Sequence, residues 1–568
     1  MKFNKLAEKL SELEKTSSRN VMMELLAELI KEIEEDEAKE LTYLILGRLR
    51  PLYDSLEFNL AEKQVQKALA RMAGIEEEEV RKEYKEVGDL GSLAEKMKNK
   101  LGVGESKNLG VKEVFKVLER IAEDQGQGSQ ERKIVGLAEL IGELDPLSSR
   151  YVVRMVMGKL RLGFSDKTIL DAVSFSVTGD KSAKSELELA YQTRPDIGWL
   201  VEEVKKKGIE KTVKGAEMVL GVPISPMLCQ RLKSTEEMVK KMGRVAVEPK
   251  FDGTRVQIHF NREGKNWQVR TFTRNLEETS QMFPELSRMM NHVRGNQLVL
   301  DSEAVGIDPK TGKMMPFQMT ITRKRKHGVE GQAGKVPLKF FVFDVMYKDG
   351  KSLTKNGYEE RRKILKEVVK DRELLVVDDH WETDDPGKIR ERHEGLLKEG
   401  LEGVIVKKLG SEYVPGRTGW RWVKMKEVEE SHAKLADTVD CVVMGYYRGK
   451  GKRTQFGVGA FLAGVRKGDE ILTITKVGTG LSDEQFRELK RRLDSLVVRE
   501  KPKVYVVDKK LEPDVWVEPG LVVELAADEV TKSPTHSAGV ALRFPRLIKF
   551  RDDKSVKEAT TVEEVKKI

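Results

Sequence analysis

VEPKFDGTRVQIHF, from Val247 to Phe260, contains two short strand patterns joined by a tight turn. Apolar and polar residues alternate from Arg255 to Phe260, the two-residue period of a strand with one buried and one polar face. An Asp-Gly step favours the turn before it. Lys250 therefore ends a strand and points into whatever cleft the sheet borders. A surface hairpin and a covalent catalyst both fit a Lys-x-Asp-Gly pattern, so this stretch alone leaves the choice open.

The first part of the chain reads as helices. In LSSRYVVRMVMGKLRLGFSDKTILDAV the apolar spacing predicts a helix that stops at Gly163, and Ser165 or Asp166 as the cap of the next one. Residues 88–110, GDLGSLAEKMKNKLGVGESKNLG, are rich in Gly, Lys and Ser, which predicts a surface loop.

The pattern changes twice further along. Two prolines in VPISPML (222–228) end the helical texture, and the alternating segments VAVEPK, TRVQIHF, NQLVLDSEAVG, FFVFDVMY and EGVIVKK follow, with helical stretches between them. From about Leu435, short strands with Gly-rich turns surround one helical segment, which suggests a small barrel. At 568 residues the chain is too long for one core. We predict an all-α domain at 1–225, an α+β domain with antiparallel sheets at 226–432, and a β-barrel at 433–568.

Composition excludes several classes of protein. No apolar run approaches the roughly 18 residues that span a bilayer, and MKFNKLAEKLSELEK lacks the apolar core of a signal peptide, so we expect a cytoplasmic protein without a membrane partner. The two cysteines, Cys229 and Cys441, and the seven histidines show no metal-ligand spacing, which argues against a zinc site or a disulfide framework. The 103 basic against 94 acidic residues suit a polyanion partner without requiring one.

Several charged side chains stand at strand ends. Glu303 ends LVLDSE and Glu402 begins EGVIVKK; each alone fits a solvated strand edge, whereas two in one domain suit Mg²⁺. In WVKMK, Lys424 and Lys426 share one strand face, as on a protected edge strand or in a phosphate clamp that Lys407 would join.

The C-terminal basic residues are interleaved with apolar ones, which favours a folded segment: Arg543, Arg546, Lys549, Arg551 and Lys554. A lysine beside a turn, two metal-competent carboxylates and paired lysines together form a set suited to phosphoryl transfer.

In their order, EPKFDG, FTRN, DSEAVG, FFVFDVMY, LEGVIVKK, WVKMK and RFPR…RDDK resemble the ATP-dependent DNA ligases, specifically the archaeal and eukaryotic replicative type. Upstream, LAEKLSELEKTSSR and YQTRPDIG resemble the helical DNA-binding domain of that family, so the resemblance covers nearly the whole chain. It implies a helical DNA-binding domain, a nucleotidyltransferase (adenylation) domain and a C-terminal OB-fold.

The resemblance also implies roles for individual residues. Lys250 would take AMP from ATP. The remaining ATP contacts would be Glu248 and Phe343 at the base, Arg255, Arg274 and Glu303 at the ribose and phosphates, Lys424 and Lys426 at the α-phosphate, and Arg543, Lys549, Arg551 and Lys554 over the pyrophosphate. Glu303 and Glu402 would bind Mg²⁺, and Arg417 and Lys407 would contact DNA.

The implied activity is sealing of nicks in duplex DNA during replication, repair and recombination. AMP would pass from ATP to Lys250, then to the 5′-phosphate of a nick, and the 3′-hydroxyl would displace it. We expect a monomer at the nucleoid. The segment KMKNKLGVGESKNLGVKEVF lacks the Gln-plus-aromatics pattern of a sliding-clamp motif, so we do not expect clamp binding by that route.

Other classes of protein fit these residues less well than a DNA ligase does. Ser302 stands where the family often has Gly, and we expect it to be tolerated. A GTP-using RNA capping enzyme or an RNA ligase would share Lys-x-Asp-Gly but would not bring the helical domain. An NAD-dependent DNA ligase would need a four-cysteine zinc module. A non-catalytic DNA-binding factor would not need an intact nucleophile, two glutamates and paired lysines.

Overall fold

The structure is a computed structural model that describes the chain up to residue 566 with some gaps. The gaps are residues 17, 55, 103–105, 161, 233, 265, 316–335, 371–372, 417–418, 427–437, 450 and 528, and only the backbone is described at 290–291, 426, 451–452 and 529. The chain forms two compact units, Met1–Glu427 and Val428–Ile568, which are described separately. The expected order of a helical, a mixed and a strand-rich region is confirmed, while the boundaries at 225 and 432 stay predictions.

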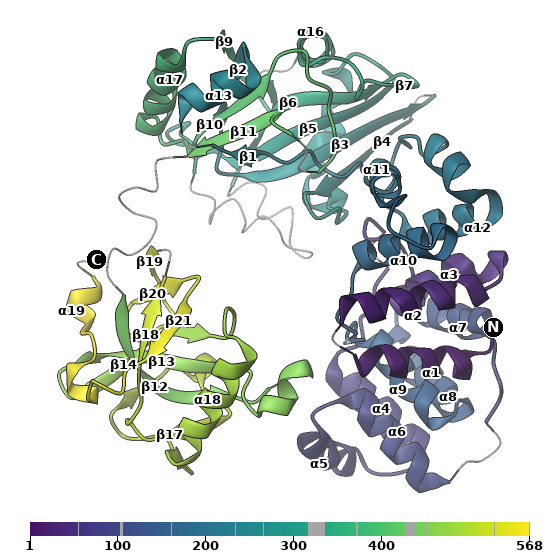
Figure 1. Cartoon of the computed structure of the whole chain (residues 1–568), viewed down its shortest axis with the longest axis vertical. Coiled ribbons are helices and arrows are strands. Elements are labelled where there is room, and N and C mark those ends of the chain that lie inside the picture. Colours follow the sequence, from purple (N-terminus) through teal and green to yellow (C-terminus); the bar gives the residue numbers. More distant parts are fainter. Residues whose placement is uncertain are drawn as a thin grey trace. The chain divides into compact units, whose positions relative to one another are not determined.

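The N-terminal part of the first unit is helical (Figure 1). Its helices are α1 (Phe3–Glu14), α2 (Arg19–Glu32), α3 (Ala38–Ile45), α4 (Glu62–Ala73), α5 (Glu77–Val87), α6 (Leu90–Leu101), α7 (Val111–Glu123), α8 (Ser129–Glu143), α9 (Pro146–Val156), α10 (Asp166–Thr178), α11 (Lys184–Thr193) and α12 (Ile197–Lys214). Their apolar faces meet in one continuous core, which runs from Phe3 to Ile209.

The prediction of a surface loop at residues 88–110 is wrong, because most of this segment forms helix α6. The Asp89 side chain accepts from the Ser92 N–H and so caps the helix start. Leu90, Leu93 and Met97 then form a buried stripe at helical spacing. Gly91 allows close packing on α9, since a Cβ there would lie 2.6 Å from the Arg150 carbonyl oxygen. Glycine, counted as a loop signal in the sequence, is here a packing residue.

The predicted stop at Gly163 is also wrong. Helix α9 ends at Val156, and Gly158 follows with a left-handed φ of 62°. Leu160 lies beyond the end of the helix but is still buried in the core. It is apolar because it is buried, and in the sequence this made the helical pattern look longer than the helix is. The next helix begins at Asp166 with Ser165 at the cap position, as predicted.

Two mainly antiparallel sheets build the second half of this unit; β1 pairs with β11 in parallel. One has the order β4-β3-β5-β6-β7, with β8 parallel to β6, and the other has the order β1-β11-β10-β2-β9. Their strands are β1 (Gln230–Arg231), β2 (Val245–Lys250), β3 (Thr254–Glu263), β4 (Asn266–Thr273), β5 (Gln297–Gly306), β6 (Leu338–Lys348), β7 (Lys351–Ser352), β8 (Leu375–Val377), β9 (Trp381–Thr383), β10 (Gly403–Lys408) and β11 (Trp422–Lys426). The helices among them are α13 (Thr235–Met242), α16 (Tyr358–Val368) and α17 (Pro386–Lys398), and the apolar faces of α13 and α17 pack on β2 and β10.

The polar face of β3 is buried rather than solvated, because residues 221–228 lie against it. Gln257 binds the backbone of Ile224 through both ends of its amide, at 2.9 and 3.1 Å. The His259 Nδ1 accepts from the Gly221 N–H at 3.0 Å, and burial lowers the pKa of His259 to about 3, so the ring is neutral. Alternation in the sequence thus identified the strand correctly, while the polar side chains serve the backbone of the preceding segment.

In its described part, the second unit consists of short strands, most of them in one sheet, and two α-helices. Its elements are β12 (Val439–Tyr447), β13 (Ala460–Lys467), β14 (Glu470–Val477), α18 (Asp483–Asp494), β15 (Val497–Val498), β16 (Tyr505–Val506), β17 (Val515–Val517), β18 (Val522–Ala526), β19 (Glu529–Lys532), β20 (Val540–Arg543), β21 (Arg546–Phe550) and α19 (Val562–Val565). Strand β12 pairs with β13 on one side and with both β17 and β18 on the other, so it is the centre of the sheet. The β19–β20 hairpin is separate, and α18 packs its apolar face into the core.

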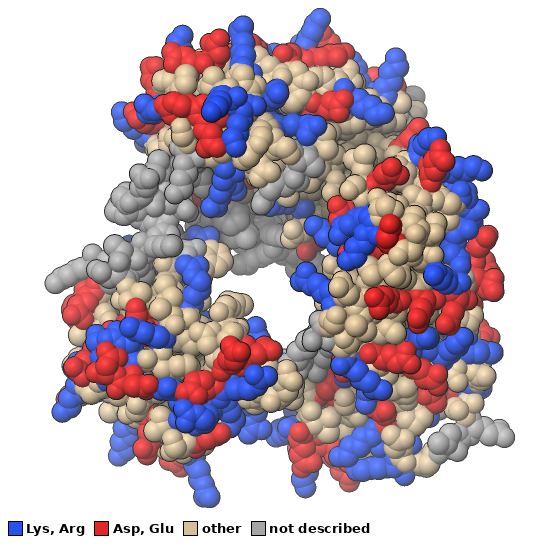
Figure 2. Space-filling model, in the orientation of Figure 1, with Lys and Arg blue, Asp and Glu red and all other residues tan. Residues whose placement is uncertain are grey.

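Figure 2 shows one face of the molecule, on which basic and acidic side chains are interspersed. Charge alone therefore does not locate a nucleic-acid surface on that face. Among the described helices, none combines the length and the apolar character needed to cross a membrane.

Candidate active site

Lys250 is the last residue of β2, and the neighbouring strand brings Glu402 to it. Gly403 opens β10 directly opposite Lys250, and the Glu402 N–H donates to the Lys250 carbonyl at 3.0 Å. The side chains then form an ion pair between Lys250 Nζ and Glu402 Oε2. They are 18% and 25% exposed, so a ligand can reach both. The structure thus brings together a lysine and a carboxylate that lie far apart in the sequence, a contact that the sequence did not predict.

Glu303 belongs to the other sheet and is electrostatically coupled to this pair. It lies opposite Arg255 in the β3–β5 ladder. Burial raises the pKa of Glu303 to about 7, against the lowering effect of Lys250 and Arg255, and Asp301 and Glu402 add to the rise. The negative charge of Glu303 is thus incompletely compensated by the protein, which fits a bound cation. Within the described residues no group of three or more His, Cys, Asp or Glu surrounds a metal position, so Mg²⁺ would rely on Glu303, Glu402 and substrate oxygens.

Gly253 lets the turn after Lys250 lie against Glu303. A Cβ at this position would come within 2.4 Å of the Ala304 carbonyl oxygen and 2.9 Å of Glu303 Cγ. Gly253→Ala is expected to push Glu303 away and to slow AMP transfer about a hundredfold, the effect of a displacement near 1 Å at a reacting centre. The measurement is the single-turnover rate with labelled ATP. Gly395→Ala on α17, where a Cβ meets nothing within 4 Å, is the matched control; equal rates in both variants would contradict the steric argument.

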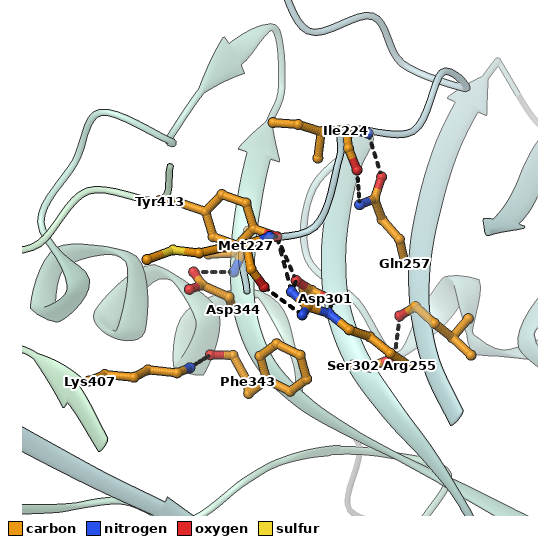
Figure 3. A network of polar contacts seen from close by, with 12 residues as sticks. Ile224, Met227, Arg255, Gln257, Asp301, Ser302, Phe343, Asp344, Lys407 and Tyr413 are labelled. Atoms are coloured by element: carbon orange, nitrogen blue, oxygen red, sulfur yellow. Dashed lines mark hydrogen bonds and ion pairs between the residues drawn. The ribbon is translucent and has the colours of Figure 1, made fainter. Parts of the chain in front are cut away.

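Arg255 is held by a buried network (Figure 3). Its guanidinium donates to both oxygens of Asp301, at 3.0 and 2.6 Å, and to the Met227 carbonyl at 2.7 Å. The Tyr413 hydroxyl donates to Asp301 at 2.8 Å. The Arg255 guanidinium lies 5.3 Å from the Phe343 ring centre, within cation–π range. Most of the N–H donors of Arg255 thus bind protein acceptors, which hold the side chain in one position beside the site. Its contact with ATP stays a prediction.

Lys407 is buried, whereas its expected contact with DNA would need an exposed ammonium. Its side chain is 0% exposed; Nζ lies 2.6 Å from Glu248 Oε2 and donates to the Phe343 carbonyl at 3.1 Å. Ile405 lies opposite Glu248 in the β10–β2 ladder, and Lys407 follows Ile405 by two residues. The Lys407 side chain is therefore on the same face of the sheet as Glu248 and Lys250. The ammonium therefore serves the interior around Glu248 and is not available to a surface phosphate.

The paired lysines of β11 share a face with Lys250. Lys426 and Lys250 both lie opposite Gly403, and Lys424 and Glu248 both lie opposite Ile405. Residues in one row across a sheet point to the same side, and two strand spacings are about 10 Å. Gly403, which lies between Lys250 and Lys426 in this register, has no side chain. Lys424 is half-buried, and Lys426 is described only by its backbone.

The other predicted residues are less constrained. Arg274 is exposed in the turn after β4, and Arg417 lies outside the described residues. Ser302 is accommodated, because its hydroxyl donates to the Val256 carbonyl at 2.7 Å. In the second unit Arg543, Arg546 and Lys549 are exposed. Arg551 and Lys554 instead form ion pairs with Asp440, at 3.0 and 2.6 Å. The pyrophosphate role of these C-terminal residues stays a prediction.

The sequence did not reveal several residues of this site. Asp301 carried one signal, an acidic residue inside the apolar run LVLDSE. Tyr413 and Trp422 pack edge-to-face with ring centres 5.6 Å apart, and nothing in their sequence context distinguishes them from ordinary core aromatics. Tyr358 and Arg362 reach Glu248 from α16 across more than a hundred residues, which no local pattern shows.

A strand that ends in a partly exposed lysine in contact with a carboxylate, beside a second sheet that carries a buried glutamate, is compatible with an enzyme that transfers nucleotidyl groups. Comparison with known families gives the narrower identity. Residues 226–426 match the ATP dependent DNA ligase domain, residues 2–174 the DNA ligase N terminus, and residues 454–554 the ATP dependent DNA ligase C terminal region. The chain belongs to the family of ATP-dependent DNA ligases.

Whole-length relatives agree with this assignment. The chain is 40% identical over 576 residues to a probable DNA ligase of Dictyoglomus turgidum, covering 100% of this chain and 97% of the relative. It is 36% identical over 589 residues to a DNA ligase of Saccharolobus solfataricus, covering 100% and 96%. A solved structure named Pmar-Lig_PreS3 shares the fold, with a TM-score of 0.53, 17% identity, and coverage of 96% of this chain and 99% of that chain.

Proposed function

We propose that this ligase seals nicks in duplex DNA, in replication, repair and recombination, and that Lys250 is its nucleophile. The observation that carries the assignment is the Lys250–Glu402 contact at the accessible end of β2, with Glu303 electrostatically coupled to it. An accessible lysine in contact with a carboxylate has an acceptor for the proton that it must lose before it can attack.

In the first step Lys250 Nζ attacks the α-phosphorus of ATP, an N–P bond forms, and the bond from that phosphorus to the bridging oxygen breaks. Pyrophosphate leaves with the electron pair. Glu402 Oε2, in contact with Nζ, is placed to accept the amine proton. AMP then passes from Lys250 to the 5′-phosphate of the nick, and the 3′-hydroxyl attacks that phosphate and releases AMP.

The remaining side chains of the first unit bind and orient. Phe343 offers a ring beside the Glu248–Lys407 pair for the base, and Lys424 and Lys426 face the α-phosphate. Glu303 and Glu402 would hold Mg²⁺, which when bound stabilises charge on the triphosphate. We further propose that Arg417 contacts DNA, that the C-terminal cations cover the pyrophosphate, and that the protein acts as a monomer in the cytoplasm, at the nucleoid.

Sealing of a labelled nicked duplex with ATP and Mg²⁺, read on a denaturing gel, tests the activity. Full-length product supports the proposal. Adenylylated nick without product would place the failure in the last step. No reaction, with labelled AMP absent from the protein as well, would refute the assignment.

Removal of divalent cations is expected to stop both AMP transfer and sealing, because Glu303 and Glu402 add negative charge beside the triphosphate and a bound divalent cation is needed to offset both. The measurement is labelled AMP on the protein after EDTA treatment, followed by addition of Mg²⁺. Transfer should return on addition; undiminished transfer in EDTA would contradict the proposed roles of Glu303 and Glu402.

A further inference from the structure

A cluster of buried charged and polar side chains surrounds Glu248. Its members are nearly inaccessible to solvent: Glu248 1%, Tyr358 1%, Arg362 4%, Asp378 4% and Lys407 0%. Burying ionised groups is costly, and ion pairs inside a protein are weak sources of stability compared with apolar packing. A cluster of this kind beside a ligand site therefore calls for a functional explanation.

Each oxygen of the Glu248 carboxylate has one fixed partner. The Tyr358 hydroxyl donates to Oε1 at 2.6 Å, and the Lys407 ammonium lies 2.6 Å from Oε2. Burial and the Glu248 charge raise the pKa of Tyr358 well above its ordinary value, so the hydroxyl keeps its proton and remains a donor. The plane of the carboxylate is thus fixed from both sides.

Arg362 supports this arrangement from the next turn of α16. It is four residues from Tyr358, on the same helix face, and its guanidinium reaches to 3.9 Å from Glu248. The same guanidinium binds the Asp378 side chain and the Asp378 backbone carbonyl, which anchor it. Tyr358 and Arg362 thus connect Glu248 to the helix that covers the other sheet.

We propose that Tyr358 is a positioning residue that makes the ligase select adenine over guanine, by fixing the orientation of the Glu248 carboxylate. This inference rests on the proposed function, in which Glu248 contacts the base of ATP. Adenine presents an amino group at C6, a donor, whereas guanine presents a carbonyl oxygen, an acceptor. A fixed carboxylate accepts from the first and repels the second.

The orientation of the Glu248 carboxylate matters because the positively charged Lys407 lies beside it. Its ammonium is a donor next to Glu248, and it lies 4.9 Å from the centre of the Phe343 ring, on which the base is proposed to stack. Without the Tyr358 hydroxyl, Oε1 would lose its hydrogen-bond donor and keep only the longer 3.9 Å contact with Arg362, so the carboxylate could turn about its side-chain torsions toward Lys407. The edge presented to the base would then be less consistently negative, and the guanine oxygen would meet less repulsion.

The test is Tyr358→Phe, which removes one hydroxyl and keeps the ring. Formation of nucleotidylated Lys250 is measured with α-labelled ATP and with α-labelled GTP. Loss of a hydrogen bond to a charged group predicts a KM for ATP raised about tenfold, kcat within about twofold, and a ratio of kcat/KM for ATP over GTP lowered about tenfold. A purely structural role would lower kcat or melting temperature without changing that ratio.

Tyr505→Phe is the matched control. Tyr505 is a buried tyrosine of the second unit, and its hydroxyl donates to the Val517 carbonyl at 2.9 Å. It should retain the wild-type nucleotide ratio with a similar loss of thermal stability. Sealing by enzyme already carrying AMP, measured for both variants, shows that each is folded and competent.

The outcomes distinguish a failure of the proposed ligase function from a failure of the role proposed for Tyr358. Wild-type protein that takes no AMP from ATP would refute the proposed function itself. Wild-type transfer together with an unchanged ATP/GTP ratio in Tyr358→Phe would overturn the inference alone, and so would a fall in kcat at constant KM. A lowered ratio in Tyr358→Phe but not in Tyr505→Phe supports it.

Discussion

Lys250→Ala is expected to abolish transfer of AMP from ATP to the protein, with a fall in rate of at least about a thousandfold, because no second nucleophile can replace an amine that forms the covalent intermediate. DNA binding should persist, since affinity for a duplex is spread over many phosphate contacts. The fold should persist too, because Lys250 and Glu402 are both partly exposed and water can solvate the remaining carboxylate. The measurement is labelled AMP on the protein, paired with a gel-shift titration of nicked DNA.

Lys250→Arg distinguishes the nucleophile from its charge. Arginine keeps the cation beside Glu402 but does not lose its proton in proteins, so it should be as inactive as alanine in AMP transfer. Partial transfer by the arginine variant would mean that the positive charge, rather than the amine, is what the reaction needs. Loss of DNA binding in either variant would show that Lys250 has a different role.

The strands and the order of the motifs could be predicted because their signals are local. Alternation over six to eleven residues gave β2, β3, β5, β6 and β10, and the Asp-Gly step gave the turn after Lys250. The contact between Lys250 and Glu402 was not predicted, because it depends on the register of β2 against β10, which no local pattern shows.

The failures share a physical cause, which is that burial depends on partners far along the chain. Gly91 looked like a loop residue until α9 was packed against it. Lys407 looked like a surface cation, yet Glu248 and the Phe343 carbonyl, from two other strands, enclose it. A lysine at a strand end can face solvent or the interior, and its own neighbours in sequence do not decide between them.

Asp344→Ala is expected to lower the free energy of unfolding by about 3–5 kcal/mol, because it leaves the Arg361 guanidinium buried without its counter-charge. The two side chains are 1% and 0% exposed, and they form parallel bonds of 2.8 and 3.0 Å. Burial raises and the Arg361 charge lowers the pKa of Asp344, with a net value below the ordinary one. The pair therefore stabilises the fold at neutral pH, and this contribution is lost as the pH falls through the folded-state pKa.

The measurement is the urea midpoint at constant slope, for wild type and Asp344→Ala, at neutral and at acid pH. The gap between the two midpoints should narrow as the pH falls, because protonation of Asp344 removes the same interaction from the wild type. Asp124→Ala is the control: Asp124 also pairs with an arginine through two bonds, of 2.9 and 2.6 Å, but Arg132 is 53% exposed and water replaces the partner. Its midpoint should match wild type. Equal effects of the two substitutions would mean that the contact between aspartate and arginine, and not its burial, determines the cost of losing it.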